Sequence, residues 1–371
     1  GGEVHNQPKS RILGGQLMSA VTSSLQASAS LPRWYNPAAL LGSFSLALAS
    51  MTLSGFEDEA GNLNLAAVIV IGYLLYMAIT FVVSRAVEGR RKSVDRMVTG
   101  LVTAAFTLAV IPLLSLTYTV VSNGLARLDA TFFSNSMRNV VGEGGGALHA
   151  IVGTLELTGI ATLISVPIGI MTAIYLVEYG RGRLAKLVTF FVDVMTGIPS
   201  IVAGLFAFTL FLVVLGPANA INGLAGAVSL SVLMVAVVIR ATEEMLKIVP
   251  NELREAAYAL GVPKWLTIIK VVIPTALAGI ATGVIIAIAR VIGETAPLLL
   301  AAGFTASMNY NPLSDKMMTL PVFVFTSFAN QGVDTQAYID RSWAGALTLM
   351  IIVMVLNLIA RIISRVFSPK G

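Results

Sequence analysis

The sequence contains no cysteine and only two histidines, His5 and His149, in 371 residues. The lack of cysteine excludes a disulfide framework, thiolate metal ligands and a thiol nucleophile. The two histidines lie too far apart to form a local metal-binding pair. There is also no Gly-x4-Gly-Lys-Ser/Thr loop of the kind that cradles nucleotide phosphates. We therefore expect no cofactor bound by this chain and no enzymatic activity of its own.

Charge is scarce as well. Only 12% of the residues are charged, about half the usual share of a soluble domain, whereas 56% are hydrophobic and the mean hydropathy is +0.85. This composition indicates a protein that lies largely within a lipid membrane. The net charge of +5 fits cytoplasmic loops facing anionic headgroups better than nucleic acid, because no basic run is interleaved with stacking aromatic residues.

Long apolar runs are what the sequence has instead. A transmembrane helix needs roughly 20 mainly apolar residues. Eight stretches meet this requirement, and we expect the sixth to continue beyond Arg240. The predicted spans are 38–56, 63–84, 97–121, 148–177, 187–215, 224–239, 275–301 and 343–367.

The distribution of lysine and arginine orients these spans. With the N-terminus inside, four of the 24 basic residues lie on the outer side and Arg290 lies within a span, which leaves 19 on the inner side. Basic residues concentrate in cytoplasmic loops. The asymmetry therefore supports eight spans with both termini in the cytoplasm of a bacterial cell. The four outer basic residues are Arg127, Arg138, Lys316 and Arg341.

The predicted fold class is an all-α polytopic membrane protein. We expect a flexible cytoplasmic arm over 1–37, an additional hairpin with a basic linker over 38–96, and a six-span core over 97–371. The core contains one long cytoplasmic connection, 240–274. On the outer side, segment 317–329 is apolar but too short to span, so it is expected to form a re-entrant or interfacial helix.

The cytoplasmic connection predicts two short helices. Good helix formers occupy 252–260, Gly261 can terminate the helix, and Pro263 prevents its continuation. A second amphipathic piece is expected over 264–273. From the residues alone, an amphipathic helix resting against lipid headgroups is an equally good interpretation.

One sequence pattern in this connection resembles a motif of a known protein family. Glu255-Ala256-Ala257, followed by Gly261 and by Val271-x-Ile273-Pro274, resembles the EAA motif of ABC-importer permeases, with Val271 and Ile273 as conservative departures. The resemblance implies that this loop is a coupling helix seated in a groove of a separate nucleotide-binding subunit. The residues implied in coupling are Arg254, Glu255, Ala256, Ala257, Leu260 and Gly261.

Four ionisable residues lie within predicted spans: Glu156, Asp193, Arg290 and Glu294. Each costs roughly 2.5–3.5 kcal/mol near the middle of a membrane helix, so each is a functional candidate. Arg290 and Glu294 are four residues apart and are expected on one helix face, with Glu156 at a similar depth. A buried network that fixes helix register remains an alternative for these residues. Asp193 is expected to cap or pair near the inner surface.

The segment Arg290 to Leu299, with its Gly293-Glu294-Thr295-Ala296-Pro297 run, resembles the PstA-type permeases of bacterial high-affinity phosphate importers, as does 195–204. The resemblance covers about 97–371. It implies that Arg290 contacts phosphate in transit and that Glu294 pairs with it, with Thr295 in the same pathway. Glu156 is assigned to the pathway from its depth alone.

The resemblance also implies an assembly in the inner membrane that works by alternating access. Its partners would be a PstC-type permease, two PstB-type nucleotide-binding subunits that hold ATP and Mg²⁺, and a PstS-type phosphate-binding protein. Two other functions stay open. One is an ABC permease for another oxyanion, such as molybdate or sulfate; the other is an ion-driven secondary transporter in which Glu156 and Glu294 carry protons.

Overall fold

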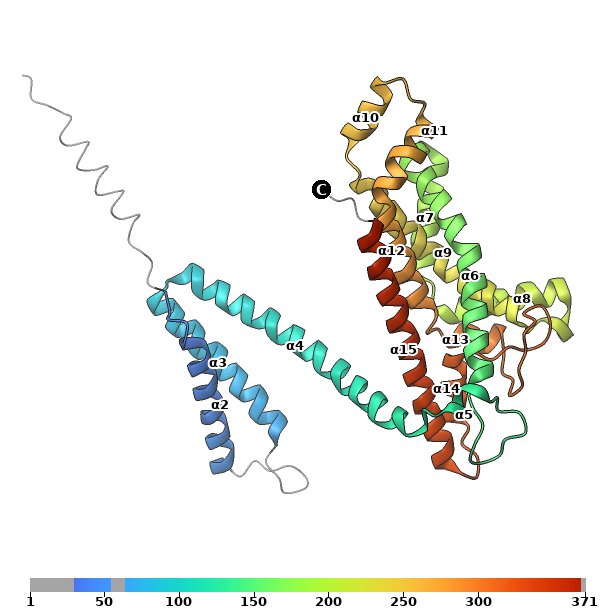
Figure 1. Cartoon of the computed structure of the whole chain (residues 1–371). Helices are drawn as coiled ribbons and strands as arrows, with labels where there is room; N and C mark the ends of the chain where they lie inside the picture. Colours follow the sequence, from blue (N-terminus) through green and yellow to red (C-terminus); the bar gives the residue numbers. More distant parts are fainter. Residues whose placement is uncertain (1–29, 55–63, 368–371) are drawn as a thin grey trace, which may run out of the picture. The chain divides into compact units, whose positions relative to one another are not determined.

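The computed structural model of the protein describes residues 30–54 and 64–367, and every regular element in these ranges is a helix. The predicted all-α class is therefore confirmed (Figure 1). The chain divides into two compact units, Gly1–Ser115 and Leu116–Gly371, and the boundary lies inside one long helix, α4 (Arg90–Gly124). Most of the predicted arm, residues 1–29, lies outside the described residues.

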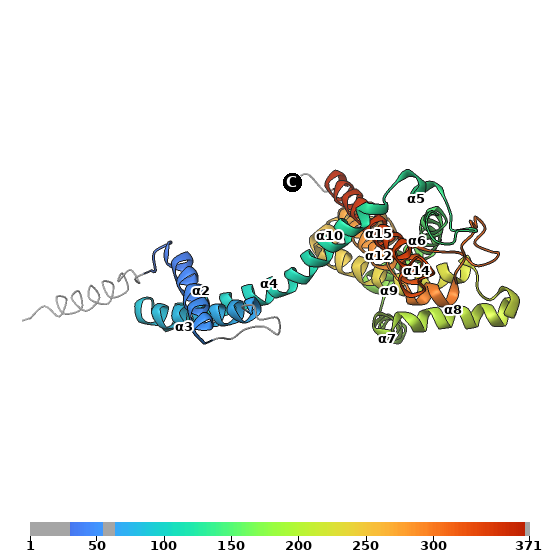
Figure 2. The same cartoon turned by 90° about the horizontal axis from the view of Figure 1, so that it is seen from below.

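The first unit contains the predicted additional hairpin, α2 (Tyr35–Ser54) and α3 (Leu65–Val87). The two helices lie side by side in both views (Figures 1 and 2). Asn64 caps α3, since its side-chain oxygen accepts a hydrogen bond from the Ala67 amide at 3.0 Å. Both helices, and α4 after them, are long and apolar enough to cross a membrane, as predicted.

Glu88 joins α3 to α4 and is the buried charge of this unit. Its carboxylate accepts hydrogen bonds from Arg96 Nε at 2.7 Å and Nη2 at 2.9 Å, from the Leu31 amide at 2.8 Å, and from the Ser84 hydroxyl at 2.7 Å. These bonds, above all the one from Arg96, lower the pKa of Glu88 to about 2. The carboxylate therefore stays ionised and holds the start of α4 against the segment that leads into α2.

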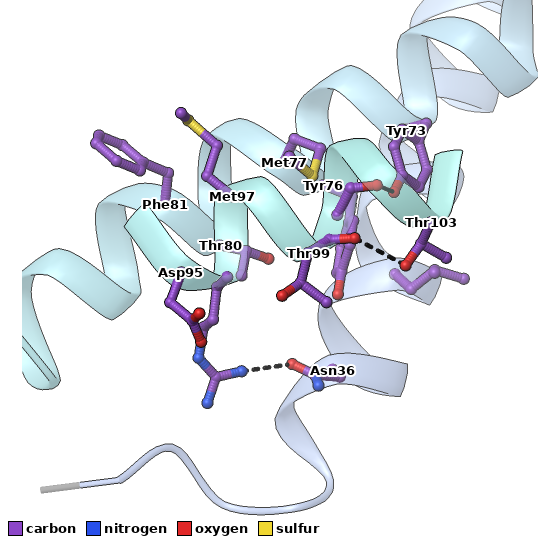
Figure 3. A pocket seen from close by; sticks show the side chains of 13 residues that line it. Asn36, Tyr73, Tyr76, Met77, Thr80, Phe81, Asp95, Met97, Thr99 and Thr103 are labelled. Carbon is purple, nitrogen blue, oxygen red and sulfur yellow. Dashed lines mark hydrogen bonds between the residues drawn. The ribbon is translucent and has the colours of Figure 1, made fainter. Parts of the chain in front are cut away.

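A cavity of about 360 Å³ lies beside this ion pair, where α2, α3 and α4 meet (Figure 3). Arg96 Nη1 donates a hydrogen bond to the Asn36 side chain at 3.1 Å across it. Further along the wall, the Tyr73 hydroxyl donates to the Gly100 carbonyl at 2.8 Å. The three helices are thus joined by polar contacts along this cavity.

The second unit is organised around α9 (Gly223–Ile248), against which α6, α7, α8, α12 and α13 all pack. Small residues dominate the buried face of α9 and allow the neighbouring helices to approach closely. The sixth predicted span therefore does continue past Arg240. The other long helices are α6 (Leu148–Ile174), extended by the π-helix η2 (Tyr175–Tyr179), α12 (Ile273–Val291) and α15 (Thr335–Phe367).

Two predicted spans are wrong in their continuity. Stretch 187–215 is not one straight helix but α7 (Arg183–Gly197) and α8 (Ser200–Leu215), bent by 108° at Ile198 and Pro199. Proline lacks an amide donor and pushes the residue before it out of helical conformation. Stretch 275–301 is also divided, because α12 ends at Val291 and α13 (Ala296–Ala301) starts anew after a break.

Counted by length and composition in the part of the chain that the structure describes, seven helices can cross a membrane, or eight if the bent α7–α8 pair is one span. The remaining elements are short. They are η1 (Leu125–Arg127), α5 (Ala130–Ser134), η3 (Pro217–Asn219), α10 (Asn251–Ala259), α11 (Lys264–Thr267), η4 (Ile268–Val272) and α14 (Leu320–Ala329).

The helix predicted over 317–329 is α14, which is too short to span and is packed into the second unit. The Leu320 amide at its start donates to the buried Thr154 hydroxyl of α6 at 2.7 Å. Figure 1 shows α14 and α5 at one end of this unit, with α10 and α11 at the opposite end. The predicted cytoplasmic loop and the predicted outer segment thus lie at opposite ends of the core.

The Glu88 ion pair leads to a first prediction. Replacing Glu88 by alanine removes the acceptor of the Leu31 amide, and hydrogen exchange at residues 30–36 should accelerate by about 10- to 100-fold, as expected for a buried charge-assisted bond of about 1.5–3 kcal/mol. The matched control is Asp95→Ala, which deletes an adjacent exposed carboxylate. Because the pKa of Glu88 is lowered, the protection should be complete above its ordinary value of 4.5 and be lost as pH falls toward about 2. Equal exchange in wild type and Glu88→Ala would contradict this role.

Candidate functional site

The predicted cytoplasmic connection forms the first of its two expected helices. α10 covers Asn251–Ala259, after Pro250 and before Gly261. Gly261 has a φ of 76°, a conformation that disfavours other residues, so glycine is required for the turn itself. The Val262 amide donates to the Ala257 carbonyl at 3.1 Å and closes the end of the helix. This part of the prediction is confirmed.

The second short helix is not a separate piece. Residues from Lys264 to Val291 form one continuous run of 28 residues in which α11, η4 and α12 follow one another without a break. Pro274 lies in the first turn of α12, directly after the wide turn of η4, where its missing amide is tolerated. The coupling segment therefore leads directly into a membrane-spanning helix.

The six residues predicted for coupling divide between two faces. Glu255, Ala256, Leu260 and Gly261 are exposed, and Leu260 is 85% accessible. Exposed apolar side chains on the same segment enlarge this surface; they are Leu253, Tyr258 and Trp265. Contiguous exposed apolar side chains mark interaction surfaces. Four of the predicted residues are thus available to a partner.

Arg254 and Ala257 face the bundle instead. Ala257 is buried. Arg254 donates from Nε and Nη2 to Glu178 Oε1 at 3.1 and 2.8 Å, and its guanidinium also reaches the carbonyls of Leu246 and Val249 at 3.0 and 2.6 Å. Arg254 therefore anchors α10 to its own subunit. Glu178, which sequence reasoning missed, lies 76 residues earlier in the chain, and no spacing rule connects the two.

Asp193 pairs near the predicted inner side, as expected. It forms an ion pair with Arg240 of α9. Arg240 also donates to Glu243 at 2.6 Å, and Glu243 accepts from Lys247 at 2.7 Å. This chain of alternating charges joins α7 to the C-terminal part of α9.

The structure does not place the predicted translocation residues as expected from the sequence. Arg290 lies in the last turn of α12, whereas Glu294 lies in the break after it, so the expected i,i+4 arrangement on one helix face is wrong. Within the described residues, no ion pair joins Arg290, Glu294 or Glu156. Arg290 is exposed on the single chain, and Glu156 Oε2 is buried without a hydrogen-bond partner. Thr295 starts α13 and lines a cavity of about 380 Å³ with α14 and α15.

The helices that follow the two breaks in the core pack against each other. Gly204 of α8 packs so closely on α13 that an added Cβ would lie 2.5 Å from the Pro297 Cα. Gly204 follows the Ile198–Pro199 bend, and Pro297 follows the break that contains Glu294. This contact places α13, the helix after the break that follows Arg290, against α8.

Comparison with solved structures defines the class of this fold. A chain of a bacterial alginate ABC transporter, solved in complex with an alginate pentasaccharide-bound periplasmic protein, aligns with a TM-score of 0.54 and 16% identity over 75% of this chain and 96% of that chain. The inward-facing MetNI methionine ABC transporter aligns with a TM-score of 0.50 and 20% identity over 60% and 96%. The core thus has the fold of an ABC-transporter permease.

Proteins of similar sequence assign the chain to a family within this class of fold. The family described as binding-protein-dependent transport system inner membrane component matches residues 165–370. The phosphate transport system permease protein PstA 1 of Mycobacterium tuberculosis is 44% identical over 292 residues, covering 78% of this chain and 94% of the relative. PstA of Yersinia pestis is 38% identical over 283 residues, covering 75% and 92%. The chain therefore belongs to the PstA family of permeases, which are multi-pass inner-membrane proteins.

The contact between bend and break leads to a second prediction. Gly204→Ala places a methyl group against the Pro297 backbone, which cannot rotate away, and should destabilise the chain by about 1–3 kcal/mol. Thermal unfolding of the purified chain in detergent measures the change. Gly159→Ala is the matched control, because this helical glycine has open space around it and should show no loss. Equal melting temperatures for Gly204→Ala and wild type would show that α8 and α13 do not pack as described.

Proposed function

We propose that this chain is the permease subunit of an ATP-driven importer and that it carries inorganic phosphate into the cytoplasm. The observation that carries the proposal is the 35–44% identity to proteins named as phosphate transport system permeases, over most of their length. The permease fold of the core supports the transport class independently, since it comes from the arrangement of helices. Alternating access of the helix bundle is the mechanism we infer.

ATP hydrolysis belongs to a separate subunit in this proposal. The chain has no phosphate-binding loop, and α10 offers an exposed apolar surface at one end of the core. We infer that α10 docks on a PstB-type nucleotide-binding subunit, which holds ATP and Mg²⁺. A second permease of the PstC type and a PstS-type phosphate-binding protein at the outer face would complete the assembly. Both termini would then lie in the cytoplasm.

Arg290 is the residue that we assign to phosphate. A guanidinium remains charged at physiological pH and offers a planar set of donors that matches phosphate oxygens. In the described part of the chain the donors of Arg290 are unoccupied, and the side chain is exposed at the end of α12. It can therefore bind an anion without first breaking an ion pair. A membrane-embedded charge of this kind normally faces a pathway or a partner subunit.

Glu294, Thr295 and Glu156 have supporting roles in this mechanism. Glu294 lies in the non-helical break between α12 and α13, where a small rearrangement of the backbone can move it toward or away from Arg290. A carboxylate that approaches Arg290 would compete with phosphate and promote its release. Thr295 sits beside this break. Glu156, whose buried Oε2 has no partner, would help to keep the local charge low when phosphate is absent.

Removal of the Arg290 charge provides the third prediction. Arg290→Gln should reduce ATP-dependent uptake of radiolabelled phosphate by about 10-fold or more, because a charge-assisted bond of about 1.5–3 kcal/mol is lost, while ATPase activity persists. Uptake is measured in vesicles that hold the complete complex. Arg361→Gln, which makes the same change at an exposed position of α15, should leave uptake close to wild type. Undiminished uptake by Arg290→Gln would remove Arg290 from the pathway. If the wild type ignores phosphate but imports molybdate or sulfate, the proposed substrate is wrong.

A further inference from the structure

Two residues of the coupling segment converge on one turn of another helix. Arg254 of α10 forms an ion pair with the Glu178 carboxylate at 2.8 Å. Lys264, the first residue of the run that leads into α12, donates a hydrogen bond to the backbone carbonyl of the same Glu178. The Lys264 ammonium also lies 4.9 Å from the centre of the Tyr179 ring. Both ends of the coupling loop are therefore joined to η2, the last turn of the α6 helix.

The Arg254–Glu178 pair is buried, unlike most ion pairs at a cytoplasmic surface. The two side chains are only 12% and 5% exposed. Arg254 also donates to the Leu246 and Val249 carbonyls, where α9 ends, and to the Asn251 side chain at 3.3 Å. One guanidinium thus joins the ends of α6 and α9 to the start of α10. Removing one partner of a buried pair leaves the other charge uncompensated, so breaking this link is costly.

The local backbone positions these groups. η2 is a π-helix, a wide turn that occurs mostly as a single turn and often at functional sites. It contains Glu178 and leaves the carbonyl of that residue accessible to Lys264. A second π-helix, η4, occurs in the run that follows Lys264. An irregular turn therefore occurs at the end of the α6 helix, where Glu178 binds Arg254 and Lys264, and another occurs in the run that starts at Lys264.

α10 is only weakly anchored in the helix bundle by its own packing. Among its nine residues only Ala257 is buried, and the helix packs against α11 and η4. Packing of this kind can move the helix that continues into α12. It reaches α6, the helix that carries Glu156, indirectly, because α12 also contacts α6. The contacts of Arg254 and Lys264 add a direct connection from the coupling segment to the end of α6.

We propose that the Arg254–Glu178 pair, assisted by Lys264, is the positioning link that makes α6 and α9 move together with the coupling helix. Arg254 and Glu178 are positioning residues and touch neither phosphate nor ATP. The link transmits the displacement of α10 to the α6 and α9 side of the core, while α11 and η4 transmit it to α12. This inference rests on the proposed docking of α10 on a separate ATPase.

The test compares transport with hydrolysis in the complete complex in proteoliposomes. Glu178→Gln keeps the size and an acceptor but removes the charge. We expect the complex to assemble and to hydrolyse ATP, while phosphate imported per ATP falls by about 10-fold. Glu244→Gln is the matched control, since this glutamate is exposed on α9 near the same level and should keep the wild-type ratio. A wild-type ratio for Glu178→Gln would overturn the proposal.

Two further measurements separate a moving link from a merely structural one. The chain has no native cysteine, so spin labels at Leu163→Cys of α6 and at Glu252→Cys, an exposed position at the start of α10 outside the predicted coupling residues, report a single distance. In the wild-type background this distance should keep one narrow distribution with and without ATP, and Glu178→Gln should broaden it. Arg254→Lys, which keeps the charge but cannot reach all the acceptors, is the milder variant if Glu178→Gln fails to assemble. Arg254→Lys should lower the phosphate imported per ATP by a smaller factor than Glu178→Gln. If this variant keeps both the wild-type ratio and the wild-type distance between the labels, the proposal is also wrong.

Failure of the proposed function would look different from failure of the link. If α10 does not dock on an ATPase, the wild-type complex itself shows no phosphate import coupled to hydrolysis, whatever residue occupies position 178. If the function is right and the link is wrong, the wild type imports phosphate and both variants match it. A double variant, Arg254→Gln with Glu178→Gln, should lose no more than the worse single variant, because both changes break one interaction.

Discussion

The pairing of backbone hydrogen bonds in a medium without water determines the architecture of this chain. Within lipid, each unpaired amide or carbonyl costs several kcal/mol, so a spanning segment must be helical, and an interruption must be enclosed by protein or line a cavity. The long helices satisfy the first condition. The bend at Pro199 and the break before α13 satisfy the second, because the helices that follow them pack closely together, with Gly204 against Pro297. The irregular parts of the core are thus localised where two elements shield each other.

The spans could be predicted from the sequence because hydropathy and length record the requirement for helical hydrogen bonding directly. The interruptions of the helices, in contrast, could not be predicted in this way. Each break occupies only a few residues inside a long, mainly apolar stretch, so the average hydropathy of the stretch does not reveal it. What divides the helices is local backbone chemistry at Pro199 and the sequence from Gly293 to Pro297, which hydropathy does not measure. The error at Glu294 has this origin: four residues of spacing imply one helix face only if the helix continues.

Contacts between residues far apart in the sequence were the second feature that could not be predicted. Helical spacing predicted the extent of α10 and the role of Gly261, since both depend on neighbouring residues. The partner of Arg254 could not be found in this way, because Glu178 lies 76 residues earlier in the chain and is brought close by the packing of α6 on α9. The EAA resemblance assigned Arg254 to the partner-facing surface along with Glu255 and Ala256. The contacts divide these adjacent residues between an inward anchor and an outward surface.

The arginines of the core show how one side-chain type serves two purposes. Arg254 has its donors occupied by a carboxylate and by carbonyls from the end of α9, and it is largely buried. Such a guanidinium has no capacity left for an anion, and its value lies in the rigidity of the bonds it makes. Arg290 is exposed on the single chain, and its donors are unoccupied in the described residues. In our proposals, occupancy of the donors, rather than depth in the membrane, therefore distinguishes Arg254, which we assign to positioning, from Arg290, which we assign to phosphate.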